Sequence, residues 1–81
     1  MRDIIERIIE YLPDSVKKDI VGFMDVRLKD GRFAIRVVSG HILTDEEKDT
    51  LKKHKDILGV DCVGHYQYAP EIKRSYFYVV K

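Results

Sequence analysis

Apolar residues at the start of the chain are spaced one helical turn apart and separated by charged residues. This spacing predicts an amphipathic helix over residues 2–12. Pro13 interrupts the pattern, and the segment after it predicts a second, shorter helix over residues 14–22, capped by Asp14 or Ser15. The apolar positions of the two helices are Ile4, Ile5, Ile8, Ile9, Leu12, Val16, Ile20 and Val21.

The next segment alternates apolar and polar residues, which is the period of a β-strand. The alternation predicts strands over residues 24–29 and 32–38, and the Asp30-Gly31 pair between them predicts a two-residue type I′ turn. With that turn at the centre of a hairpin, Leu28 opposes Phe33. One face of the hairpin is then core, formed by Met24, Val26, Leu28, Phe33, Ile35 and Val37, and the other carries Arg27, Lys29, Arg32 and Arg36 against Asp25.

A third helix is predicted over residues 45–58. Thr44 and Glu47 have the spacing of a capping box, in which each side chain bonds the other residue's backbone N–H. Gly59 has the position of the glycine that follows a helix end. The apolar side of this helix is thin, consisting of Leu51, Ile57 and Leu58 with His54 among them.

Two runs rich in β-branched and aromatic residues follow, and they predict strands over residues 60–68 and 74–80 around a connection at Pro70. One register of this second hairpin gathers Tyr66, Tyr68, Tyr76 and Tyr78 on one side, where burial would demand four hydroxyl partners. The register shifted by one residue is preferred because it gives a conventional core of Val60, Cys62, Gly64, Tyr66, Phe77 and Val79. It leaves His65, Gln67, Tyr76 and Tyr78 outside, with Arg74 at the rim.

The order of these elements predicts an α+β fold of the type α(α)ββαββ, a two-layer sandwich. Two hairpins form a four-stranded, mainly antiparallel sheet, and the helices cover one face of it, because neither hairpin can bury its apolar side alone. A length of 81 residues indicates a single domain, residues 1–81. The strand order beyond the two hairpins is not readable from the sequence.

Composition narrows the function classes. With 44% hydrophobic and 36% charged residues the chain is typical of a globular protein, and a net charge of +1 gives no general basic surface for coating duplex nucleic acid. The single cysteine, Cys62, excludes an internal disulfide and suits a reducing cytoplasm. The N-terminal segment has neither a signal-peptide core nor a membrane span, so no membrane role is expected. The absence of Asn beside abundant charged residues resembles thermophile composition.

Side chains that carry chemistry are few. Cys62 lies between strand-forming valines, which favours a packed thiol over a nucleophile, and Cys62 with His65 provides too few ligands for a metal site. His41, in a loop at a strand end, is the best-placed candidate for a catalytic role. No phosphate-binding loop or catalytic triad pattern occurs, so neither cofactor nor metal is expected, and an enzyme is the third hypothesis for this chain.

The favoured hypothesis is a small non-enzymatic interaction module. It would self-associate, or bind a protein partner, through its sheet face or through a free edge at Tyr76 to Val80. The alternative is binding of single-stranded RNA or DNA, since aromatic and cationic side chains on an open sheet suit base stacking and phosphate contact. The candidate surface residues are Arg27, Lys29, Arg32, Arg36, His65, Gln67, Arg74, Tyr76 and Tyr78.

Overall fold

The computed structural model describes residues 6–7, 9–10, 12–66 and 69–81. Residues 6, 7, 9 and 10 are helical, and the rest of the predicted helix 2–12 lies mostly outside the described residues. The elements that follow are α2 (Asp14–Lys17), β1 (Ile20–Arg27), β2 (Phe33–Ser39), α3 (Asp45–Lys52), β3 (Ile57–Tyr66) and β4 (Ala69–Val80).

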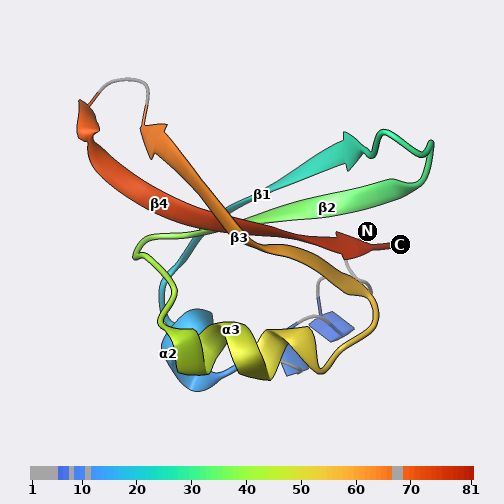
Figure 1. Cartoon of the computed structure of the whole chain (residues 1–81), viewed down its shortest axis with the longest axis horizontal. Helices are drawn as coiled ribbons and strands as arrows, with labels where there is room; N and C mark the ends of the chain where they lie inside the picture. Colours follow the sequence, from blue (N-terminus) through green and yellow to red (C-terminus); the bar gives the residue numbers. More distant parts are fainter. Residues whose placement is uncertain (1–5, 8, 11, 67–68) are drawn as a thin grey trace.

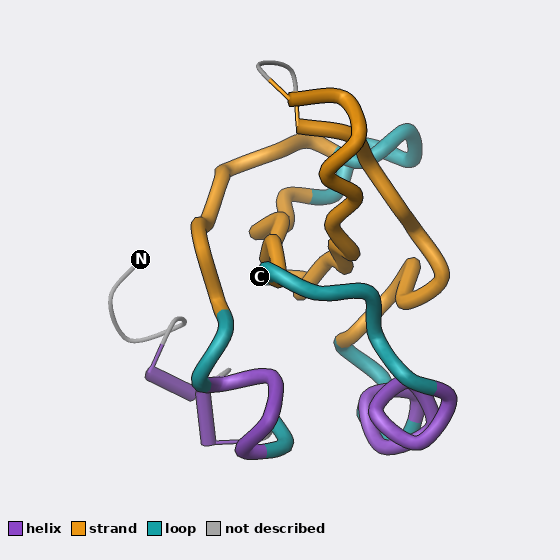
Figure 2. The backbone as a smooth tube through the Cα atoms, turned by 90° about the vertical axis from the view of Figure 1, so that its left-hand side faces the viewer, coloured by secondary structure: helices purple, strands orange, loops and turns teal. Residues whose placement is uncertain are grey.

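These strands form a four-stranded antiparallel sheet in the order β1-β2-β4-β3, and α2 and α3 lie on one side of it (Figures 1 and 2). The predicted α+β class, the order of the elements and the two hairpins are therefore confirmed. β4 lies between β2 and β3, so α3 connects two strands that are not neighbours. β4 is consequently an interior strand of the sheet, and the predicted free edge at Tyr76 to Val80 is wrong.

The core fills the space between the helices and the sheet. Along β2 and β4 alternate residues point to this side, as Ile35, Val37, Phe77 and Val79 do, and all four are buried. We call this side of the sheet the inner face and the opposite side the outer face. The whole buried cluster consists of Leu12, Val16, Ile35, Val37, Leu43, Leu51, Ile57, Val60, Phe77 and Val79.

The first hairpin is paired one residue away from the predicted register. Arg27 opposes Phe33 and Val26 opposes Ala34, so Met24 and Val26 share a face with Arg36 instead of with the core. The cause is the turn. Gly31 has a φ of 91°, whereas no non-glycine residue among those described has a positive φ. Asp30 therefore does not adopt the positive φ that a type I′ turn requires at both central residues.

The chain instead makes a longer loop, in which Gly31 N–H donates to the Leu28 carbonyl at 2.9 Å and Leu28 N–H donates to the Arg32 carbonyl at 2.8 Å. The Asp30 carboxylate accepts from the Arg32 backbone at 3.1 Å, which holds the turn in this form. Met24, which was expected in the core, lies on the outer face and is 55% exposed. Phe33 keeps its expected face with Ile35 and Val37 but is 60% exposed at the start of β2, so it does not join the core.

The helices predicted over residues 14–22 and 45–58 are both longer than the helices in the structure. Residues 14–22 contain only the short α2, because β1 begins at Ile20, which pairs with Ser39. Residues 45–58 contain α3 up to Lys52, and Ile57 begins β3 by pairing with Val79. In both cases β-branched residues that fit a helical apolar side pair in the sheet instead, because tertiary pairing outweighs local propensity.

In the second hairpin, Phe77 and Val79 are buried on the inner face and Tyr76 and Tyr78 lie on the outer face, as preferred from the sequence. Val60 is also in the core. Cys62, however, pairs with Tyr76 and Gly64 with Arg74, so both belong to the outer face and not to the core. The register shift between Leu58 and Cys62 accounts for the error, since strict alternation fails across a bulge. The side chain of Tyr66 lies outside the described residues.

Candidate functional sites: the His41 cluster and the outer face

His41 lies in the loop between β2 and α3, and neighbouring elements hold this loop from two directions. Gly40 N–H donates to the Asp19 carbonyl at 2.7 Å, and Leu43 N–H donates to the buried Ser75 hydroxyl of β4 at 2.9 Å. Asp19 itself stands between α2 and β1, so the loop joins the start of the sheet to the start of α3.

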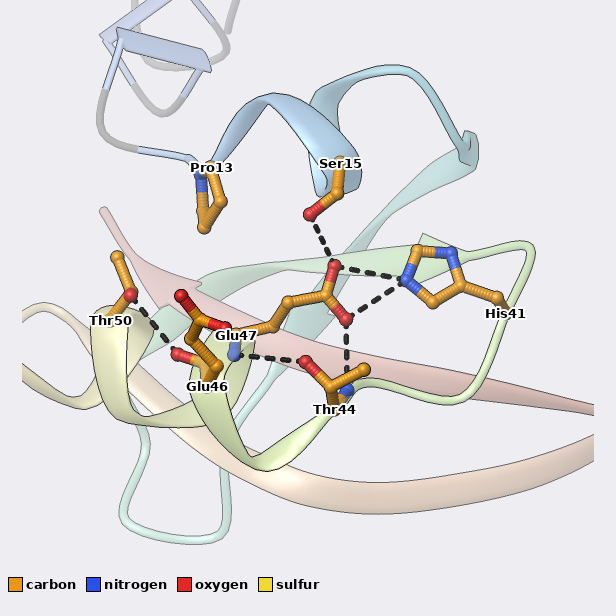
Figure 3. Close-up of a pocket in the computed structure, with 7 residues that line it drawn as sticks. All are labelled: Pro13, Ser15, His41, Thr44, Glu46, Glu47 and Thr50. Carbon is orange, nitrogen blue, oxygen red and sulfur yellow. Dashed lines mark hydrogen bonds and ion pairs between the residues drawn. The ribbon is translucent and has the colours of Figure 1, made fainter.

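The imidazole of His41 is held between two carboxylates. Its Nδ1 is 2.5 Å from Asp19 Oδ2, and its Nε2 is 3.1 Å from both oxygens of Glu47. The Ser15 hydroxyl of α2 donates to Glu47 Oε2 at 2.5 Å (Figure 3). We refer to Ser15, Asp19, His41 and Glu47 as the His41 cluster. It joins α2, the β1 junction, the loop and α3.

Glu47 also completes the predicted capping box of α3. Its carboxylate accepts from Thr44 N–H at 2.8 Å, and its own N–H donates to Thr44 Oγ1 at 3.2 Å. The capping box was predictable from the Thr44 and Glu47 spacing. The contacts with Ser15 and His41 were not, because no local pattern in the sequence joins residues so far apart.

Electrostatics keep the cluster charged. Burial raises the pKa of Glu47, but the hydrogen bonds from Ser15, Thr44 and His41 outweigh it and lower that pKa to about 2. The hydrogen bond to Asp19 raises the pKa of His41 above its usual value of 6.5, and Glu47 adds to the effect against the opposing influence of burial. The raised pKa favours the imidazolium form of His41, in which each ring nitrogen can donate to a carboxylate.

This geometry does not assemble a hydrolytic site. Both ring nitrogens of His41 are occupied by acids. The Ser15 hydroxyl donates to Glu47, whose lowered pKa of about 2 makes that carboxylate a weak base for removing the hydroxyl proton. Asp19 and Glu47 lie at opposite nitrogens of the ring, which prevents them from converging on one ion. Within the described residues, no group of three or more acids, histidines or cysteines is placed to hold a metal.

A shallow pocket of about 390 Å³ borders the cluster. Ser15, His41 and Glu47 contribute to its wall, together with residues of the α3 start, and Figure 3 shows the Glu47 carboxylate turned toward Ser15 and His41. The hydrogen bonds of this region connect secondary-structure elements to one another. These charge-assisted bonds fasten α2 and the start of β1 to α3.

The outer face is the second candidate site. No described helix covers it, since α2 and α3 lie on the inner side (Figure 1). Cross-strand pairing arranges its side chains in rows, and one row crosses all four strands as Met24, Arg36, Tyr78 and Leu58. The flanking rows are Gly22, Val38, Tyr76 and Cys62 on one side and Val26, Ala34 and Val80 on the other. In these three rows, Arg36 alone is charged.

Two tyrosine rings hold the Arg36 guanidinium. Its central carbon is 5.2 Å from the Tyr76 ring centroid and 5.4 Å from that of Tyr78, and Nη2 donates to the Tyr78 hydroxyl at 3.2 Å. Such stacking is a favourable cation–π arrangement. The two rings meet edge to face, with their centroids 6.0 Å apart.

Glycines of β3 make room for these rings. A Cβ added at Gly59 would lie 3.0 Å from Tyr78 Cδ2, and one added at Gly64 would lie 3.1 Å from Tyr76 Cε1. Each ring therefore rests directly above glycine backbone. The sequence prediction placed Tyr76 and Tyr78 together on this face but missed their glycine supports, because the bulge in β3 sets which residues oppose them.

The remaining predicted surface residues are dispersed. Arg27 opposes Phe33 across the inner side of the sheet, and its guanidinium stacks on that ring at 5.5 Å. Lys29 and Arg32 belong to the turn, where Arg32 Nε is 2.6 Å from Asp30. Arg74 follows the same face as Tyr76 and pairs with Gly64, and the His65 backbone pairs with Lys73. The side chain of His65, and Gln67 entirely, lie outside the described residues.

Comparisons with protein-family models, with curated proteins and with solved structures found no match to this chain. The helices in the described part of the chain include none long and apolar enough to cross a membrane. Functional inference therefore depends on the geometry of the two sites.

Proposed function

We propose that this protein is an interaction module that binds a protein partner on its outer face. The observation that carries the proposal is an apolar sheet face, free of cover by the described helices, with one arginine held between two tyrosines at its centre. Tyr and Arg are enriched among the residues that dominate interface energetics, and apolar surface surrounds them at interface centres.

The same geometry gives less support to single-stranded nucleic acid. Arg36 already occupies the ring faces of Tyr76 and Tyr78 on one side, and glycine backbone lies against these rings, which leaves little surface for stacking bases. The cations expected to line one face also separate, since Arg27 opposes Phe33 on the inner side. Affinity for a phosphate backbone grows with the number of cations that contact it.

Selection from a random peptide library displayed on phage tests the proposal. Clones recovered on the wild-type protein are assayed on Val38→Glu, which places a charge in the outer face, and on Val63→Glu as the matched control. Val63 is 44% exposed and pairs with Ser75, whose side chain is buried on the inner side. We expect clones that bind the wild type and Val63→Glu but not Val38→Glu. Recovery only of clones indifferent to Val38→Glu would contradict the proposal.

Self-association is a second candidate, favoured by the edge strand β1. At this edge of the described sheet, Val21 and Phe23 are 48% and 39% exposed, and Asp25 is the sole charge between Ile20 and Val26. An exposed apolar edge is a template for pairing with another strand, and a lysine blocks it. Sedimentation equilibrium should show dimers of the wild type that Val21→Lys abolishes, and a wild-type monomer at millimolar concentration would exclude this candidate.

A further inference from the structure

We propose that Arg36 binds a carboxylate of the partner, so that the outer face selects extended segments carrying Asp or Glu between apolar residues. This inference rests on the proposed function, because it names the chemistry that the outer face recognises.

Arg36 has donors to spare. Among the described residues it donates a single hydrogen bond, to the neutral Tyr78 hydroxyl, and its Nε is buried without an acceptor. It also forms no ion pair with any acid in the described part of the chain. Several other cations of the chain, in contrast, form ion pairs with acids. Arg32 pairs with Asp30, and Lys81 Nζ lies 2.6 Å from Asp25 Oδ1. Because Nε is too buried to contact an external group, an anion would be bound by the Nη1 and Nη2 N–H groups that form no hydrogen bond among the described residues.

The guanidinium is also fixed in place before any ligand arrives. Stacking against Tyr76 and Tyr78 restrains the plane of the guanidinium. The two tyrosine rings in turn pack against the backbone of Gly59 and Gly64. A long, flexible side chain ordinarily loses rotamer freedom on binding, and a side chain that is already ordered loses less. Fixed planar donors match the planar carboxylate group, which an arginine can engage with two parallel hydrogen bonds.

The surroundings of Arg36 select the rest of the ligand. Directly across the strands lie Met24, which is 55% exposed, and Tyr78, with Val38 in the next row. Side chains that alternate along an extended peptide would meet this apolar surface on both sides of the central acid. One central cation suits one carboxylate, whereas a nucleic acid strand presents a phosphate at every nucleotide.

Isothermal titration calorimetry with a matched peptide pair tests the inference. The first probe is a blocked nonapeptide of alternating leucine and threonine with glutamate at its centre, and the second carries glutamine there. We expect the glutamate peptide to bind the wild type roughly tenfold more tightly. The preference should shrink as salt rises and vanish in Arg36→Leu, while Lys29→Leu, which removes one charge from the exposed turn, should leave it unchanged.

One further measurement and one further variant guard against misfolding. Circular dichroism must show a folded Arg36→Leu, and Arg36→Lys, which keeps the charge but not the planar fork, should lose most of the preference. Equal binding of both peptides on the outer face would overturn the carboxylate proposal and leave the interaction module standing. Failure of both peptides to bind would overturn it as well, and the phage selection then decides the proposed function separately. Tighter binding of single-stranded oligothymidine than of the glutamate peptide would also contradict it.

Discussion

Glu47 is the residue on which the His41 cluster depends. Its side chain is 8% exposed and accepts from Ser15 and from Thr44 N–H while contacting His41. A buried carboxylate is tolerated only with such partners, since hydrogen bonds to charged groups contribute more than neutral ones. Its neighbour Glu46 is exposed, and among the described residues its carboxylate forms no hydrogen bond or ion pair with the His41 cluster.

Replacement of Glu47 by glutamine should therefore lower the free energy of unfolding by about 2 kcal/mol at pH 6, because the charge opposite His41 is lost. Glu46→Gln is the matched control and should change it by less than ~0.5 kcal/mol. Urea denaturation followed by circular dichroism measures both. Equal effects of the two substitutions would show that the cluster does not stabilise the fold.

The pH dependence of stability follows from the same residues. Since the folded pKa of His41 is raised above 6.5, its contribution is complete below pH 6.5 and is lost as pH rises through the folded value. Since the folded pKa of Glu47 is lowered from 4.5 to about 2, its contribution is present above pH 4.5 and is lost as pH falls toward 2. The contribution of the cluster should be greatest between about pH 4.5 and 6.5.

Thermal unfolding at pH 6 and pH 9 tests this dependence. The wild type should exceed His41→Gln in Tm at pH 6. The difference in Tm should narrow toward pH 9, because the imidazole loses its charge as the pH rises through its raised folded pKa. A difference that is the same at both pH values would mean that His41 stabilises the loop by packing alone.

At the scale of elements, the turns and bulges decide how the strands pair. The Asp30-Gly31 pair predicted a hairpin in the right place, yet two turn types are compatible with that pair and differ by one residue in register. A one-residue difference moved Met24 from the expected core to the outer face and Arg27 away from Arg36. Alternation alone cannot distinguish the two turns, because both registers bury apolar residues.

The sequence indicated that Gly59 has a special backbone conformation, but it predicted the wrong structural role for it. Its position after an apolar helical stretch predicted the end of a helix, and it does have a positive φ of 67°. That conformation serves the bulge of β3 instead, beneath the Tyr78 ring. The His41 cluster was beyond local patterns altogether, since Ser15, Asp19 and Glu47 meet His41 only once the elements are packed.

Gly59→Ala should lower the free energy of unfolding by about 1–2 kcal/mol, because an L residue is strained at positive φ and its Cβ would press on Tyr78. Gly22→Ala is the control in β1, where an added Cβ meets nothing within 4 Å and the φ is not positive. Guanidinium denaturation of both variants measures the difference. A tolerated Gly59→Ala would place Tyr78 elsewhere than above this glycine.

At the scale of the whole molecule, the two faces of the sheet have different roles. The inner face holds the core, and Phe77 is its largest fully buried side chain. Phe77→Ala should cost roughly 3–5 kcal/mol of stability, whereas Tyr76→Ala, one residue along the strand on the outer face, should cost less. Chemical denaturation compares them, and the reverse order would place the core on the other side.

The outer face then carries the function that we propose, and one measurement tests it most directly. Amide chemical shifts of the ¹⁵N-labelled protein are followed during titration with the central-glutamate nonapeptide. Binding at the outer face predicts shifts concentrated at Met24, Arg36, Tyr76 and Tyr78, with Thr50 and Lys52 of α3 unchanged. Shifts centred on α3 or on the His41 cluster, or no shifts at millimolar peptide, would contradict the account.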